Sequence, residues 1–231
     1  MALTREPDTV STVVGKDAQM GYSGIALHLD GFAMRYFFIL EEYPMNKTHR
    51  NIRALCEGAI MVALAFILSL IKLFPNLPNG GSITFAMFPI CLYAVRWGLG
   101  KGLLAGLVFG ISQLLFDGAY AWGWQSMILD YIVAFTPLGL AGIFKGKDWG
   151  IFPGIVVGCV GRFIVHYISG VTVYRIYAPT EIPGIGVFDD AQLYSLIYNG
   201  AYMLPCMLLA LAVAAVLFVP MKKFFAGKDI L

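Results

Sequence analysis

Residues 54–74 read ALCEGAIMVALAFILSLIKLF, an apolar run in which Glu57 and Lys72 are the charged side chains. A transmembrane helix needs about 20 mostly apolar residues to cross a hydrocarbon core of about 30 Å, and this run meets that requirement. Similar runs follow along the chain at about 82–98, 101–117, 126–144, 151–174 and 193–220. The sequence therefore predicts an all-α, polytopic membrane protein with six transmembrane helices.

The composition favours a membrane protein over a soluble domain. Hydrophobic residues make up 59% of the 231 residues and charged residues 13%, whereas a soluble domain carries about 25% charged residues. The formal net charge of +2 is too small to indicate a nucleic-acid partner. The cysteines fall inside apolar runs without CxxC spacing, so we expect buried core residues and no metal site. They are Cys56, Cys91, Cys159 and Cys206.

The first 44 residues differ from the rest of the chain. They carry many charged side chains and no sustained helical period, and the apolar stretch at 32–40 is too short to span a bilayer. We interpret 1–44 as an N-terminal extension that is either disordered or outside the native chain, with Met45 as an alternative start. The transmembrane domain then occupies 45–231.

Basic residues predict the orientation, because segments rich in Lys and Arg stay on the cytoplasmic side. Ten of them fall on one side of the predicted spans, and only Lys72 and Arg175 fall on the other. We therefore expect both termini in the cytoplasm and outer loops at about 75–81, 118–125 and 175–192. The last loop is rich in Pro and Gly, which indicates turns without an element of its own.

Charged side chains inside a span are costly, so they are candidates for function. Asp130 lies about one turn below the outer surface in the fourth predicted span. One face of the fifth span carries a residue of interest at every fourth position: Arg162, His166, Gly170 and Tyr174. Tyr194 and Asn199 occupy the first turns of the sixth span. We expect Asp130, His166, Tyr194 and Asn199 to converge near the outer face.

The remaining polar groups have simpler interpretations. Glu57 lies near the cytoplasmic end of the first span, where we expect it to be solvated. Arg162 lies nearer the membrane midplane than His166, so we expect protein acceptors to hold it and the fold to depend on it. Trp122 and Trp124, in the loop before the fourth span, form either an interfacial belt or part of the site.

A carboxylate with aromatic, amide and imidazole groups suits a small, cationic, aromatic ligand, because aromatic faces attract cations and the polar groups bond to heterocycle nitrogens. An intramembrane enzyme with Asp130 and His166 as an acid–base pair is an alternative, but no nucleophile or metal set accompanies them. A structural scaffold without a ligand is a third. The chain has no HExxH, GxSxG, P-loop or Rossmann motif, so it has no means of hydrolysing ATP.

Five short motifs follow one another between about residues 50 and 220: GGSIT at 80–84, LDYIVAF at 129–135, RFIVHYISG at 162–170, YAP at 177–179 and YSLIYNG at 194–200. Together and in this order they resemble the thiamine-specific substrate-binding (S) subunits of energy-coupling-factor (ECF) transporters. The resemblance implies a multi-pass protein of the bacterial plasma membrane that captures extracellular thiamine with high affinity. It implies no enzymatic activity and no cofactor. It also implies partners: a transmembrane coupling subunit and two ATPase subunits.

The resemblance also implies roles for single residues. Asp130 stands where many relatives have Glu and would face the thiazolium ring, and Tyr174 stands where an aromatic residue, often Trp, stacks on the ligand. The other pocket positions are Tyr120, Tyr131, His166, Gly170, Tyr194 and Asn199. Ala59 and Ala63 match a small-residue patch that docks on the coupling subunit; packing within the chain is the alternative. The alternative within this class is a binding subunit for another vitamin or cationic heterocycle, such as a riboflavin-type compound; a neutral ligand would not need the carboxylate.

Overall fold

The computed structural model describes most of the transmembrane domain. The described residues are 46–74, 77, 80–116, 123–174, 181–182 and 185–230. The interpretation of residues 1–44 as an extension falls outside this set and stays a prediction.

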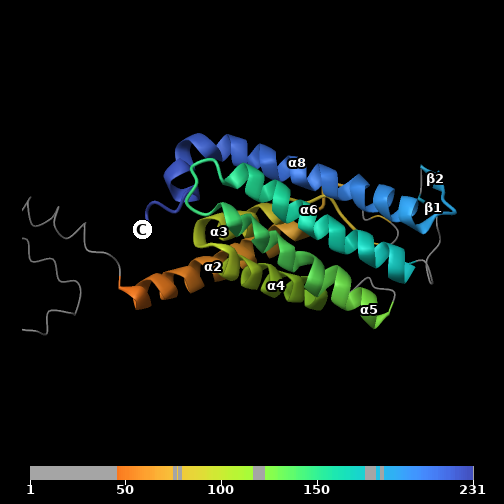
Figure 1. Ribbon diagram of the computed structural model, residues 1–231, viewed down its shortest axis with the longest axis horizontal. Helices are drawn as coiled ribbons and strands as arrows, with labels where there is room; N and C mark the ends of the chain where they lie inside the picture. Colours follow the sequence, from red (N-terminus) through yellow and green to blue (C-terminus); the bar gives the residue numbers. More distant parts are fainter. Residues whose placement is uncertain are drawn as a thin grey trace, which may run out of the picture. The chain divides into compact units, whose positions relative to one another are not determined.

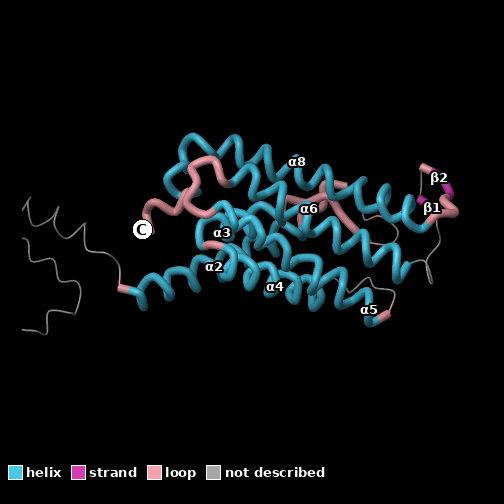
Figure 2. The backbone as a smooth tube through the Cα atoms, viewed as in Figure 1, coloured by secondary structure: helices cyan, strands magenta, loops and turns pink. Residues whose placement is uncertain are grey.

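The described residues confirm an all-α membrane architecture with six successive helical segments (Figure 1). Figure 2 shows that helix accounts for nearly all of the described backbone. In chain order the segments are α2 (Lys47–Leu70), α3 (Met87–Trp97), α4 (Leu99–Phe116), then α5 (Trp124–Ser126) continued by η1 (Met127–Val133) and η2 (Thr136–Phe144), then α6 (Ile151–Ser169) continued by η3 (Gly170–Tyr174), and α8 (Ala191–Phe225). The last outer loop differs from the prediction, because β1 (Glu181–Ile182) pairs antiparallel with β2 (Gly186–Val187).

Five of these segments are long and apolar enough to cross a membrane, and α3 is the exception. The sequence predicted a span at 82–98, but the helix has 11 residues, or roughly 16 Å at 1.5 Å per residue. All 11 are buried within the protein. The hydrophobicity of α3 therefore reflects a protein core on every side, and the non-helical residues 82–86 precede it.

The other helices pack around α3, which contacts α2, α4, η2, α6 and α8. The packing of α4 on the fourth segment is especially close. A Cβ atom added to Gly106 would lie 2.5 Å from the Phe135 carbonyl oxygen, and one added to Gly110 would lie 2.4 Å from that of Tyr131. These glycines let the two backbones approach each other, as small residues do between membrane helices.

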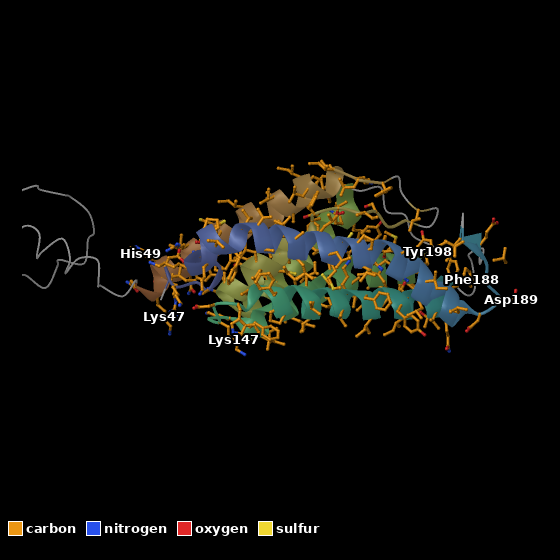
Figure 3. All side chains as sticks on the ribbon, turned by 90° about the horizontal axis from the view of Figure 1, so that it is seen from above. Lys47, His49, Lys147, Phe188, Asp189 and Tyr198 are labelled. Carbon is orange, nitrogen blue, oxygen red and sulfur yellow. The ribbon has the colours of Figure 1, made fainter. Side chains whose placement is uncertain are left out.

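The two ends of the bundle differ in chemistry. Figure 3 shows Lys47, His49 and Lys147 at one end and Phe188, Asp189 and Tyr198 toward the other. The start of α2 and the C-terminal residues lie at the same end (Figure 1), and Lys228 Nζ is 2.6 Å from Asp148 there. This arrangement agrees with an even number of crossings; that the basic end faces the cytoplasm remains the prediction from charge.

A buried ion-pair cluster lies at the basic end of the bundle. The Arg96 side chain is fully buried, and each of its three nitrogens donates to the protein. Its Nε and Nη2 lie 2.7 and 3.1 Å from the Glu57 oxygens, its Nη1 lies 2.8 Å from the Phe224 carbonyl, and both Nη atoms donate to Asp229. The expectation that Glu57 is simply solvated is therefore wrong: Trp97 also donates to it, at 2.7 Å.

The cluster fixes the C-terminal tail against α2 and α3. Helix α8 departs from helical geometry at Met221, directly after Pro220, and the chain then turns so that Asp229 reaches Arg96 and Arg53. Hydrogen bonds from Arg96 hold the pKa of the Asp229 carboxyl below its usual range, against the opposing effect of partial burial. The tail is thus part of the folded domain.

We predict that Arg96→Gln destabilises the protein by about 3–5 kcal/mol, because it removes the buried cation that Glu57 and Asp229 share and leaves them only the partly exposed Arg53. Thermal unfolding in detergent measures the effect. Arg50→Gln is the matched control, since Arg50 is exposed in the first turn of α2 and its loss should change stability by less than about 0.5 kcal/mol. Equal melting temperatures for the two variants would show that the cluster does not stabilise the fold.

Candidate ligand-binding site

A cavity lies among the non-basic ends of the helices, and every segment except α3 contributes to its wall. Helix α2 provides Ser69, and α4 provides Phe109 and Gln113. The fourth, fifth and sixth segments supply most of the polar side chains. Its lining residues from these segments are Asp130, Tyr131, Phe135, Arg162, His166, Gly170, Tyr194, Ser195, Tyr198, Asn199 and Tyr202. The non-helical segment before α3 adds Gly80, Gly81, Ser82, Thr84 and Ala86.

Asp130 projects into this cavity from an irregular stretch of helix. Met127–Val133 forms a π-helix, a distortion that is frequent at functional sites because it re-aims side chains. One carboxylate oxygen of Asp130 accepts from Ser126 Oγ at 2.6 Å, and the other lies 3.1 Å from His166 Nδ1. The side chain is only 12% exposed, so these two donors compensate part of its desolvation. Carboxylate oxygens keep further acceptor positions for a ligand.

His166 joins Asp130 to Arg162. Arg162 Nε donates to His166 Nε2 over 3.3 Å. Because the guanidinium can only donate, Nε2 must accept, and a neutral imidazole then carries its proton on Nδ1 and donates to Asp130. His166 therefore holds the carboxylate in place from the neighbouring helix.

The amide of Asn199 is held against α6. Its Nδ2 donates to the carbonyls of His166 and Ser195 at 3.3 and 3.0 Å, and its Oδ1 accepts from Tyr202 Oη at 3.0 Å. The contact requires Gly170, because a Cβ atom there would lie 2.2 Å from Ser195 Oγ. Gly170 thus lets α8 approach η3 closely enough for its side chains to reach the cavity.

Aromatic rings form the α8 wall. Tyr194 and Tyr198 stack with centroids 5.5 Å apart, and Tyr202 lies edge-on to Tyr198 at 6.3 Å. Tyr198 Oη donates to the Gly80 carbonyl at 2.7 Å and so ties the segment before α3 to this wall. Such rings present faces that attract a cation.

The structure brings together six of the eight predicted pocket residues. Asp130, Tyr131, His166, Gly170, Tyr194 and Asn199 all line the cavity. Tyr120 lies outside the described residues, and for Tyr174 only the backbone, in η3, is described. Trp122 is also outside that set, whereas Trp124 is 68% exposed, as expected of an interfacial belt.

Sequence reasoning missed several cavity residues. Ser126 was not considered, although it stands one helical turn before Asp130. Tyr198 and Tyr202 follow Tyr194 at four-residue spacing, so the helical period alone placed them on the same face. Arg162 differs from its expectation, because it lines the cavity and, among the described residues, its side chain donates a single hydrogen bond, to His166. Ser69, Gln113 and Phe135 gave no signal in the sequence.

The cysteine expectation holds for three of the four residues. Cys91, Cys159 and Cys206 are buried, and Cys206 Sγ donates to the Ser82 carbonyl at 3.4 Å beside the cavity. Cys56 is exposed on α2 and is no core residue, because it lies on a face of that helix that the other described residues do not cover.

A second surface lies between α2 and α4. Both Ala59 and Ala63 are exposed there, in an apolar groove with side walls from Leu55, Val62, Phe66, Leu104 and Val108. The described part of the chain therefore leaves this small-residue patch uncovered, which argues against the alternative that it packs within the chain.

These features define a class: a multi-pass α-helical membrane protein with a polar, aromatic-walled cavity for a small ligand near one membrane face. The chain belongs to the thiamine transporter protein family (Thia_YuaJ), whose family model matches residues 55–226. It is accordingly a transport protein of the cell membrane and not an enzyme.

Similarity to individual proteins of known name supports the same family assignment. The chain is 34% identical over 188 residues to the thiamine transporter ThiT of Bacillus subtilis (strain 168), which covers 75% of this chain and 94% of that protein. It is 32% identical over 202 residues to ThiT of Lacticaseibacillus paracasei, covering 78% of this chain and 94% of that one. The solved structure of ThiT from Listeria monocytogenes is similar with a TM-score of 0.65 at 29% identity, over 76% of this chain and 98% of that one.

We predict that Gly170→Ala destabilises the protein by about 1–3 kcal/mol, because the new methyl group forces α8 away from η3. Gly200→Ala is the matched control: Gly200 lies within α8 with nothing within 4 Å of an added Cβ, so the helix should gain about 0.5–1 kcal/mol. Melting temperatures of the two variants should move in opposite directions. Parallel shifts would mean that the close contact is not required.

Proposed function

We propose that this chain binds extracellular thiamine with high affinity as the substrate-binding subunit of an ECF-type importer. The observation that carries the proposal is the Asp130 carboxylate, 12% exposed and held by Ser126 and His166 at the edge of an aromatic cavity. The family membership and the names of the relatives support thiamine as the ligand.

The chemistry of thiamine matches the cavity group by group. Its thiazolium ring carries a permanent positive charge, which Asp130 can neutralise and the tyrosine faces of α8 can attract. Its aminopyrimidine ring presents donors and acceptors, for which Asn199, Tyr194 and Tyr202 offer an amide and phenols. Tyr131, His166 and Gly170 complete this part of the wall, and Tyr120 and Tyr174 are proposed ligand contacts from the family resemblance.

We predict that Asp130→Asn weakens thiamine binding by about 2–5 kcal/mol, or roughly 30-fold to several thousand-fold, because it keeps the shape and removes the charge. Calorimetry or tryptophan fluorescence with the purified protein measures the affinity. Asp148→Asn is the matched control, since Asp148 pairs with Lys228 at the basic end. Unchanged affinity in Asp130→Asn would exclude this residue as the partner of the cation.

Uptake against a gradient requires partner subunits, since the chain has no ATP-binding motif. We propose that the groove around Ala59 and Ala63 docks a transmembrane coupling subunit, which in turn associates with two ATPase subunits. Small residues exposed at i and i+4 allow a partner helix to approach closely within the bilayer. The groove lies mainly on α2 and α4, and none of its lining residues also lines the cavity.

We predict that Ala63→Trp prevents assembly with the coupling subunit while thiamine binding to the isolated chain survives. The indole would fill the groove and block close helix approach. Ile60→Trp is the matched control, because Ile60 is 64% exposed on α2 but does not line the groove. Co-purification of co-expressed subunits measures assembly. Normal assembly of Ala63→Trp would place the docking surface elsewhere.

A further inference from the structure

Two arginines of the bundle differ in how the protein satisfies their donors. All three nitrogens of the buried Arg96 donate to Glu57, Asp229 or a main-chain carbonyl. Arg162 lies midway along the membrane segment Ile151–Val173, where an unsatisfied guanidinium is most costly. Its Nε donates to His166, but within the described part of the chain no acceptor is recorded for its Nη1 or Nη2.

The position of Arg162 shows where these remaining donors can act. The guanidinium carbon lies 4.0 Å from the centroid of the Phe135 ring, so one face of the group is covered by an aromatic side chain. Arg162 also lines the same cavity as Asp130 and Asn199. A guanidinium has five N–H donors, four of them on the two Nη atoms. Those donors are held at the cavity wall by the bond to His166 and by the contact with Phe135.

The neighbouring histidine is already engaged on both sides. His166 accepts from Arg162 through Nε2 and donates to Asp130 through Nδ1. The series of contacts Arg162–His166–Asp130 thus holds a cation and an anion on the same wall, with the imidazole between them. A ligand beside Asp130 meets a negative group at one point and a set of strong donors at another.

We propose that Arg162 is a ligand-binding residue whose Nη groups donate to a neutral hydrogen-bond acceptor of the bound cation. For thiamine, on which this inference rests through the proposed function, the acceptor is a pyrimidine ring nitrogen or the hydroxyl oxygen. Asp130 then selects the positive charge of the ligand, and Arg162 requires an acceptor at a fixed distance from that charge. His166 is the positioning residue that couples the two.

Electrostatics predicts opposite changes in thiamine affinity for a bystander Arg162 and for a ligand-binding Arg162. If Arg162 merely stands near the site, its positive charge repels the thiazolium ring, and Arg162→Gln should strengthen thiamine binding. If Arg162 donates to the ligand, the same substitution removes a charge-assisted hydrogen bond and should weaken binding about 10- to 100-fold. The direction of the change therefore separates the two readings.

The experiment compares wild type and Arg162→Gln, each as the full chain in detergent, with four ligands. These are thiamine and three analogues in which CH replaces N1′, CH replaces N3′, or H replaces the hydroxyl. With thiamine, we expect the variant to bind about 10- to 100-fold more weakly than wild type. With one of the analogues, we expect the two proteins to differ by no more than about threefold. That analogue identifies the acceptor. The control Arg96→Gln should lower the melting temperature but bind thiamine within about threefold of wild type when folded.

Either of two results would overturn the inference. Arg162→Gln could bind thiamine as tightly as wild type or more tightly, or it could lose the same factor with all four ligands, as general damage to the site would cause. If Arg162→Gln does not fold, Arg162→Lys replaces it in the same comparison, because lysine keeps the charge but loses the forked Nη donors. The inference then requires weaker thiamine binding by Arg162→Lys, with most of that loss absent for one analogue. Wild type that fails to bind thiamine would overturn the proposed function as well, whereas wild type that binds thiamine confines any failure to Arg162.

Discussion

A buried charged side chain is costly unless the protein supplies its partners, and that cost governs how this bundle is arranged. Arg96 is tolerated because two carboxylates and a carbonyl surround it, and those partners come from α2, α8 and the C-terminal tail. The cluster consequently joins segments that are far apart in the sequence. Asp130 is held in the same manner by Ser126 and His166, but its partners leave it facing a cavity.

The cavity forms where the backbone departs from regular helix. Asp130 lies in the π-helical segment 127–133, and Gly170 begins another at 170–174. Residues 80–86, before the short helix α3, contribute non-helical backbone to the wall. Non-helical backbone is tolerated at membrane depth where protein surrounds it or where it lines a polar cavity. The stability of the regular helices around α3 therefore supports an irregular, polar region near one face.

Helix α2 takes part in both functions that we propose. Near its end, Ser69 accepts from Gln113 Nε2 at 2.8 Å at the cavity wall, while Ala59 and Ala63 form the exposed groove two to three turns earlier. Glu57, in the same stretch of α2 as the groove, anchors the helix to Arg96. The same helix thus connects the ligand cavity, the proposed docking groove and the ion-pair cluster. A change in the packing of α2 would therefore alter the geometry of all three.

The sequence by itself determined the membrane class, the number of helical segments, the family and most of the polar residues of the cavity. Apolar runs of bilayer length and the four-residue spacing along α6 and α8 are local properties of the sequence, so they do not depend on the tertiary packing. The tertiary structure decided the rest. It made α3 a buried helix instead of a full span, because hydrophobicity alone does not distinguish lipid from protein surroundings. It placed Glu57 in an ion-pair cluster with Asp229, 172 positions away in the chain, a contact that no local pattern encodes. It also put Arg162 on the cavity wall, with Nη donors that meet no acceptor among the described residues, because the depth and direction of a side chain depend on how neighbouring helices pack against it.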